Sequence, residues 1–368
     1  MNDFLRKGER EALMLPNRGP IVFEPNGKLQ PAIVDSYLEY GFYVFKNVIS
    51  SKELRDIDAD FQNLRTRLPR KKDSPVDSTG RPALSVDCSA PTLQWARPLS
   101  DPNGGTTIAG GRYPVKMDEP KPRIGSPSDI VYLILGSLQF SEAHLRLYGH
   151  PDLLRIAASI NGDDFTPFNE SIFIKEPGLG ASVAWHQDGI THWDHPDWES
   201  GIHGFNFMMQ LYGSTAANGV WVVPGTHKLG RVDIKAMVRK NGNSRLRQAV
   251  PLIADPGDVI INNRQLVHGS FANTSKKIRV TFNQGFHKRS SVVGVQGGGL
   301  HNAPALYTEK RIKERSRLVG LAIDARKQRY PDEISYEYKP LRDECTTLRW
   351  KTGMLETLKD YNMLDFSI

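Results

Sequence analysis

Short apolar runs separated by Pro-Gly turns are the feature that most constrains the fold of this 368-residue chain. The turn dipeptides are Pro177-Gly178, Pro224-Gly225 and Pro256-Gly257. Many short strands with turn signals between them favour a sandwich or barrel over a parallel α/β sheet. We therefore predict a mainly β core that begins near Phe168. Its expected strands are 170–175, 183–186, 205–211, 220–223, 258–261, 266–268 and 278–285.

The chain ahead of this core predicts helices that flank the sheet. Residues 31–40 have helical apolar spacing, and residues 41–49 are a strand-like apolar run. Ser50 or Ser51 is expected to cap a following helix, because a serine oxygen can accept a hydrogen bond from the first turn. Two further helical segments are predicted at 128–147 and 151–160.

Three other regions complete the predicted domain organisation. Residues 1–30 contain several prolines and glycines and are interpreted as an irregular N-terminal arm. The catalytic domain is placed at 31–290, with a loop insertion at about 66–127 that is either a lid or a surface loop. Residues 291–368 form a charged helical C-terminal extension, with a last helix near 347–361. This extension is expected to pack either on the core or on a partner subunit. In the second case the protein would be a homo-oligomer.

Charge and cysteine content narrow the class of partner. The formal net charge of +7 is dispersed, and its densest run, residues 65–72, has few interleaved aromatic residues. That run indicates a solvated loop, so we expect no nucleic-acid partner. Cys88 and Cys345 are too few for a disulfide framework or a thiolate metal site. No apolar run is long enough to predict a membrane span, and we expect a cytoplasmic protein.

One short motif predicts a metal site. In Trp185-His186-Gln187-Asp188-Gly189, the histidine and the aspartate are separated by one residue. Side chains alternate along a strand, so both could point to the same side. His268 is the candidate third ligand. Two imidazoles and one carboxylate on one face of a metal are typical of non-haem Fe(II) oxygenases.

A candidate anion-binding residue follows the third ligand. Arg279 lies eleven residues after His268, and the intervening segment has turn composition. A hairpin centred on Asn273-Thr274 would place residue 279 opposite residue 268. A guanidinium there is suited to holding a carboxylate in bidentate fashion. Ser270 could point the same way and add a hydroxyl donor.

Taken together, these motifs resemble the phytanoyl-CoA dioxygenase family of Fe(II)/2-oxoglutarate-dependent oxygenases. The matching segments lie within residues 31–290. They are the H-x-D motif, Glu39 to Val48, Trp221-Val222-Val223-Pro224-Gly225-Thr226-His227-Lys228, His268-x-Ser270 and Arg279. The resemblance implies a double-stranded β-helix, the jelly-roll or cupin-like fold, which agrees with the predicted strands.

The resemblance also implies roles for individual residues. His186, Asp188 and His268 would bind Fe(II), and Arg279 with Ser270 would hold the distal carboxylate of 2-oxoglutarate. Several members of the family have a tryptophan beside the cosubstrate where this chain has Phe207.

The implied reaction uses O2 and 2-oxoglutarate to hydroxylate or otherwise oxidise a small organic molecule, either a natural product or an acyl metabolite, and releases succinate and CO2. Related halogenases lack the carboxylate, so Asp188 disfavours halogenation.

Other readings stay open at this stage. A cupin-like metal-dependent hydrolase or isomerase could use the same three ligands, but it needs no anchor such as Arg279. A non-catalytic jelly-roll module is the third class. Candidate substrate contacts are Trp185, Trp193 and His192, for which packing or surface positions are the alternatives. His227 is interpreted as part of a turn rather than a ligand.

Overall fold

Two β-sheets form the centre of the molecule. In the computed structural model, which describes residues 3–189, 198–199, 201–297, 305–344, 347–351 and 353–361, the larger sheet has eight strands and the smaller has four. All pairings within these two sheets are antiparallel except that of β1 with β2. In spatial order the larger sheet is β1 (Arg18–Gly19), β2 (Phe42–Phe45), β10 (Val259–Asn263), β7 (Gly204–Gln210), β12 (Arg279–His287), β5 (Thr166–Lys175), β4 (Ile130–Leu135) and β3 (Leu93–Ala96). The smaller is β6 (Val183–His186), β11 (His268–Ser270), β8 (Trp221–Val222) and β9 (Val250–Pro251).

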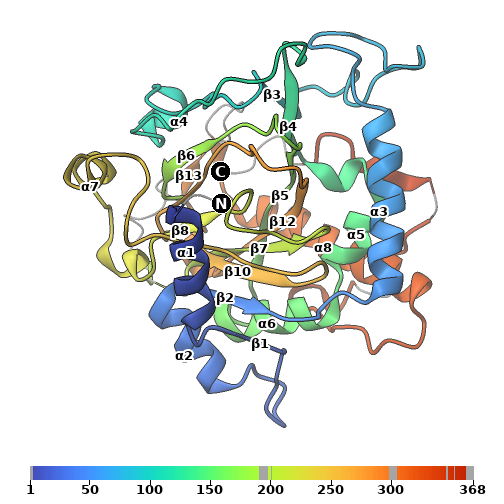
Figure 1. The fold of residues 1–368 in the computed structure, drawn as a ribbon. Coiled ribbons are helices and arrows are strands. Elements are labelled where there is room, and N and C mark those ends of the chain that lie inside the picture. Colours follow the sequence, from blue (N-terminus) through green and yellow to red (C-terminus); the bar gives the residue numbers. More distant parts are fainter. Residues whose placement is uncertain are drawn as a thin grey trace.

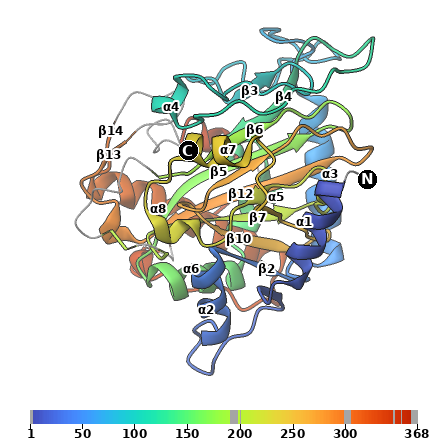
Figure 2. The same cartoon turned by 60° about the vertical axis from the view of Figure 1, so that its left-hand side comes forward.

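Helices cover one face of the larger sheet (Figures 1 and 2). The main apolar core lies between that face and the covering helices. The covering helices are α2 (Pro31–Tyr40), α3 (Ser51–Thr66), α5 (Glu142–Tyr148), α6 (Pro151–Asn161) and α8 (Glu309–Arg329). The remaining elements are α1 (Asp3–Met14), α4 (Ile108–Gly111), α7 (Ile234–Asn241), the pair β13 (Gln296–Gly297) and β14 (Ala305–Leu306), and 3₁₀ turns η1 (Ser137–Gln139), η3 (Thr226–Leu229), η4 (Arg289–Ser291), η5 (Lys339–Leu341) and η6 (Met354–Leu358).

Alternation along the strands separates this core from a pocket between the two sheets. On β12, Val280 and Phe282 pack against the helices, whereas Arg279 and Thr281 face the pocket. Successive side chains of a strand point to opposite faces, so the same strand contributes to both. The predicted mainly β, cupin-like core with flanking helices is therefore confirmed.

The predicted cap of α3 is also present. The Ser50 hydroxyl accepts a hydrogen bond from the Glu53 N–H at 3.2 Å. This contact satisfies one of the amide groups that lack a partner in the first turn of a helix. The sequence signal was local, and no tertiary contact was needed to find it.

The prediction of an irregular N-terminal arm is wrong for its first half. Residues 3–14 form α1, and Phe4 stacks on Trp221 with ring centroids 4.5 Å apart. A Cβ at Gly8 would lie 2.4 Å from the Trp221 ring, so the helix approaches the smaller sheet very closely. The prolines and glycines that suggested an irregular arm lie after this helix, from Pro16 onwards.

The predicted helix at 128–147 is divided into a strand and a shorter helix. Residues 130–135 are six consecutive apolar residues that form β4 and are buried on both faces. A short apolar run of this kind has no periodicity that separates a buried strand from a buried helix. Only α5 at the end of the segment is helical, apart from the turn η1.

The C-terminal extension packs on the core. In α8, Arg315 forms a buried ion pair with Glu170 of β5 at 3.0 Å, and Arg326 pairs with Glu53 of α3 at 2.7 Å. The predicted last helix at 347–361 is reduced to η6 within the described residues. None of the described helices has the length and apolar character that crossing a membrane requires.

We predict that Arg315→Met strongly destabilises the protein, because it leaves the Glu170 carboxylate buried without its cation. Breaking a buried pair on one side costs about 3–5 kcal/mol. Urea denaturation at neutral pH measures the change. The matched control is Arg317→Met on the same helix, whose side chain is 54% exposed and pairs with Glu344. Equal denaturation midpoints for the two variants would contradict an integral role for α8.

Candidate metal centre and pocket

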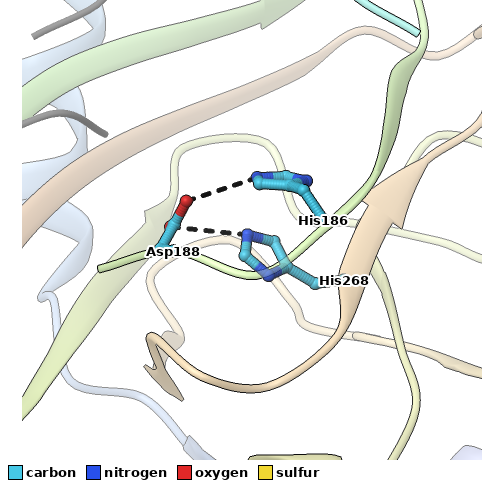
Figure 3. Close-up of side chains that lie close together, drawn as sticks. All are labelled: His186, Asp188 and His268. Carbon is cyan, nitrogen blue, oxygen red and sulfur yellow. Dashed lines mark ion pairs between the residues drawn. The ribbon is translucent and has the colours of Figure 1, made fainter. Parts of the chain in front are cut away.

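Three potential metal ligands meet at the end of the pocket between the sheets. One ligand atom each from His186, Asp188 and His268 lies within 4.8 Å of the other two (Figure 3). Asp188 Oδ1 is 3.5 Å from Nε2 of His186, and Asp188 Oδ2 is 3.6 Å from Nε2 of His268. The sequence-predicted trio is thus brought together in one place.

Strand register and local backbone contacts produce this arrangement. His268 of β11 is the register partner of His186 of β6. Asp188 follows β6, and its N–H donates to the carbonyl oxygen of Arg264 at 2.8 Å. Two ligands therefore come from adjacent antiparallel strands, and the third comes from the loop that leaves the first strand.

Both imidazole rings are oriented with Nε2 towards Asp188, where this nitrogen could bind a metal. Nδ1 of His186 lies 2.8 Å from the carbonyl oxygen of Ala184, and Nδ1 of His268 lies 2.8 Å from that of Leu266. A carbonyl only accepts, so Nδ1 of each ring carries a hydrogen, and Nε2 is the nitrogen that faces Asp188 and is available to a metal. Burial, followed by the neighbouring His268, lowers the pKa of His186 to about 3, which keeps this ligand neutral. A neutral imidazole is the form that binds metal.

Surrounding groups keep the Asp188 carboxyl ionised. Burial by itself raises the pKa of Asp188, but nearby His268 and His186 outweigh it and lower the pKa well below its usual range. The guanidinium groups of Arg112 and Arg264 act in the same direction. The donor set is therefore one carboxylate and two imidazoles, which fits a divalent first-row metal ion.

Residues of the predicted loop insertion also reach this centre. Nη1 of the buried Arg112 lies 3.3 Å from Asp188 Oδ1, and the Tyr113 ring centroid is 4.8 Å from that of His186. The Asp101 carboxylate accepts hydrogen bonds from the N–H groups of Gly104 at 3.0 Å and Met117 at 2.7 Å, which holds the segment in place. This part of the insertion therefore lies against the candidate metal ligands.

The sequence did not identify Arg112 and Tyr113 as site residues. They occur in a Gly-Gly-Arg-Tyr run without regular apolar spacing, and nothing local relates them to the H-x-D motif. Their contacts join segments more than seventy residues apart, so only the folded chain reveals them.

Arg279 and Ser270 line the same pocket as the three ligands, although the predicted hairpin is wrong. β11 belongs to the smaller sheet and pairs with β6 and β8, whereas β12 pairs with β5 and β7 of the larger sheet. The register partner of Arg279 is Lys175, not His268. The turn segment after Ser270 carries the chain from one sheet to the other, so both residues face the pocket from opposite walls.

A buried cation, Arg279, forms part of the wall of this pocket. Arg279 is 2% exposed, and its Nε and Nη1 have no hydrogen-bond partner among the described residues. Burial lowers its pKa to about 10, so the group is still a cation at neutral pH. The neighbouring Lys175 is equally buried and donates to the Phe271 carbonyl oxygen. A buried guanidinium without an acidic partner is suited to an anionic ligand.

Two predicted contacts lie elsewhere. Phe207 is buried in the main core beside Phe205, because its position on β7 turns it away from the pocket. Asn206 and Met208 occupy the pocket face of that strand instead. Trp185 is fully buried in the second apolar core and donates to the Ser244 carbonyl oxygen at 2.7 Å, so it does not line the pocket.

Two further predicted contacts cannot be placed. The candidate substrate residues His192 and Trp193 lie outside the described residues. His227, interpreted as part of a turn, lies in η3, and its Nε2 is 2.9 Å from the Leu38 carbonyl oxygen.

Comparison with known proteins agrees with the geometry. Residues 137–281 match the model of the phytanoyl-CoA dioxygenase family, and this range includes the three candidate ligands, Ser270 and Arg279. Fold and site define a jelly-roll protein with a candidate two-histidine, one-carboxylate metal centre.

Curated relatives match only parts of the chain. Phytanoyl-CoA dioxygenase 1 of Oryza sativa subsp. japonica is 31% identical over 117 residues, which are 29% of this chain and 39% of that protein. L-proline trans-4-hydroxylase of Streptomyces griseoviridis is 25% identical over 185 residues, which are 43% of this chain and 69% of that protein. The chain thus spans well under half the length of the rice relative.

Solved structures share the fold. The structure of EctD from S. alaskensis with 2-oxoglutarate and 5-hydroxyectoine superimposes with a TM-score of 0.51 at 17% sequence identity. The match covers 74% of this chain and 80% of that one. At this level of identity the likeness establishes the architecture.

We predict that the protein binds one divalent metal ion at this centre and that His268→Ala weakens binding at least about a hundredfold. Loss of outer partners of metal ligands already costs about 10–100-fold, so loss of a ligand should cost more. Anaerobic calorimetric titration with Co(II) measures the affinity. His227→Gln is the control and should bind as the wild type does. Similar affinities for His268→Ala and the wild type would refute the assignment.

Proposed function

We propose that this protein is a non-haem Fe(II)- and 2-oxoglutarate-dependent dioxygenase. It hydroxylates or otherwise oxidises a small organic molecule, with O2 as oxidant, and releases succinate and CO2. The single observation that carries the proposal is the occurrence, in one pocket, of a three-ligand metal centre and a buried arginine without an acidic partner among the described residues.

The ligand set supports Fe(II). His186, Asp188 and His268 would hold the ion from one side, which leaves coordination positions open for a chelating cosubstrate and O2. The Asp188 carboxylate would bind the ion where halogenation requires a halide, so oxygen transfer is favoured over halogenation. Iron with bound 2-oxoglutarate supplies the oxidising power, by coupling decarboxylation of the cosubstrate to oxidation of the substrate.

The second end of the pocket supports a dicarboxylate cosubstrate. Arg279 would hold the distal carboxylate in bidentate fashion, and the Ser270 hydroxyl would donate a further hydrogen bond. Burial, followed by the neighbouring Arg279, lowers the pKa of Lys175 well below its usual value, so Arg279 carries the positive charge of this site. Met208 rather than Phe207 would form the apolar wall of this site, because Met208 is on the pocket face of β7.

The chain's own residues position the reactants and limit water access. Asp188 and the two histidines orient the ion, and Tyr113 covers His186 from the side of the insertion. Because the three ligands are at most 12% exposed in their side chains, bulk water reaches the centre mainly through the pocket. A shielded centre protects the enzyme from unproductive oxidation.

A cupin-like metal-dependent hydrolase or isomerase is the alternative function. The same trio could activate a water molecule or polarise a carbonyl group. That chemistry gives no reason for Arg279 to be buried at the far end of the pocket without an acidic partner among the described residues. A non-catalytic jelly-roll module would need neither feature.

We predict that anaerobic titration of the Fe(II) protein with 2-oxoglutarate produces a weak metal-to-ligand charge-transfer band in the visible region. Arg279→Met should raise the dissociation constant of 2-oxoglutarate by roughly thirtyfold or more, because losing one partner of a buried charge pair costs about 2 kcal/mol or more. The dissociation constant of Arg279→Lys should lie between those of the wild type and Arg279→Met, since lysine keeps the charge and loses the bidentate geometry.

The control is Arg97→Met, whose side chain is 72% exposed and pairs with Glu119. It should titrate as the wild type does. Absence of the band in the wild type, or an unchanged band in His268→Ala, would overturn the oxygenase proposal and favour the hydrolase alternative.

A further inference from the structure

Three asparagine side chains form a cluster on the floor of the pocket. Asn262 of β10 is the register partner of Asn206 of β7, so these two amides are neighbours across adjacent strands. Asn283 of β12 pairs with Met208, two residues along β7 from Asn206 and on the same face. All three line the pocket that contains the metal centre.

Two of these amides have unmet hydrogen-bonding capacity. Asn206 is 6% exposed and Asn262 is fully buried, and the Oδ1 atom of each has no hydrogen-bond partner among the described residues. The residue opposite Asn206 on β12 is Gly285, so no side chain covers the amide from that strand. Buried carbonyl oxygens without partners are costly, and native structures contain few of them. Their position on a pocket wall indicates that a ligand supplies the missing donors.

The other described residues of the pocket wall restrict the charge of that ligand. Apart from the metal ligands and Arg279, they include no lysine, arginine, aspartate or glutamate. The proposed function already uses those four residues for iron and 2-oxoglutarate. A charged substrate group would be left without an opposite charge at this floor, and burying it so would be unfavourable.

An alkyl chain would also fit poorly, because it cannot donate to the two carbonyl oxygens. A hydroxyl group both donates and accepts, so it can pair with the oxygen and the nitrogen of an amide. Directly opposite residues on neighbouring strands have Cβ atoms about 4.5–5.5 Å apart. The amides of Asn206 and Asn262 can therefore reach separate hydroxyl groups of one small ring.

We propose that the substrate is a neutral, polyhydroxylated small molecule of the sugar or cyclic-polyol class. Its hydroxyl groups donate to Oδ1 of Asn206 and Asn262, and Asn283 lies at the same floor. This inference rests on the proposed function only in that it leaves Arg279 to the cosubstrate. It goes against a long-chain acyl substrate at this floor.

The test measures binding of simple probes to the zinc(II)-loaded protein with 2-oxoglutarate, by saturation-transfer NMR. The probes are myo-inositol, methyl α-D-glucopyranoside and, as the apolar comparison, cyclohexanol. We expect at least one polyol to bind more tightly than cyclohexanol. Asn206→Leu and Asn262→Leu should each weaken binding of that polyol at least about tenfold. Leucine has nearly the shape of asparagine but provides no hydrogen-bond acceptor. Cyclohexanol should bind these variants as well as or better than the wild type, which also shows that they are folded.

The control is Asn63→Leu, the same change at an exposed position of α3. It should leave polyol binding unchanged. Three outcomes would overturn the inference. The wild type could bind cyclohexanol more tightly than either polyol, it could bind neither polyol, or the wild type and both leucine variants could bind the polyol equally well.

The charge-transfer titration separates this inference from the proposed function. Absence of the band in the wild-type Fe(II) protein would refute the oxygenase proposal. The preference for a polyol is measured separately, on the zinc(II)-loaded protein, so it does not depend on that band. A normal band in the wild type that is lost in Asn206→Leu or Asn262→Leu would assign these amides to the cosubstrate. That result would also overturn the substrate assignment.

Discussion

The pairing of β11 with β6 is the constraint on which the rest of the site depends. It makes His268 the register partner of His186, although the two lie on separate parts of the chain. Residues directly opposite on antiparallel strands are close enough to share a ligand. The hydrogen bond from Asp188 to the Arg264 carbonyl oxygen then turns the carboxylate back towards both imidazoles. A shift of this register by one residue would move His268 to the other face of the sheet.

Buried charge is arranged differently at the two ends of the pocket. At the metal end the carboxylate of Asp188 meets Arg112, and both side chains are almost fully buried. At the other end Arg279 is a buried cation beside its register partner Lys175, whose pKa is lowered by burial and by Arg279. Burying a charge without a partner is costly, so the second end is stable only if an anion or water compensates it. The pocket wall thus combines a candidate metal centre with a buried cation.

Segments outside the β core complete the molecule. Helix α8 joins distant parts of the chain through Arg315 with Glu170 and Arg326 with Glu53. The insertion contributes Tyr113 to the pocket wall. Both segments had been predicted mainly from charge or from lack of periodicity. Such signals describe how a segment meets solvent but do not show which buried surface it contacts.

The sequence alone determined the parts that depend on local chemistry. The H-x-D motif was identified from residue type and spacing, and the strand 183–186 was placed at its observed bounds. The helix cap at Ser50 was found in the same way. These signals are local because alternation, turn residues and capping act within a few positions. Arg279 lines the same pocket as the H-x-D motif, although the hairpin that was predicted to place it there is wrong.

Tertiary structure decided what depends on partners far along the chain. It assigned β11 and β12 to different sheets, turned Phe207 into the core and Met208 to the pocket, and brought Arg112 to Asp188. The floor of asparagines likewise arises only when three strands align. The physical reason is that the face of a strand and its neighbours are set by register and burial across the whole sheet, which no short window of sequence contains.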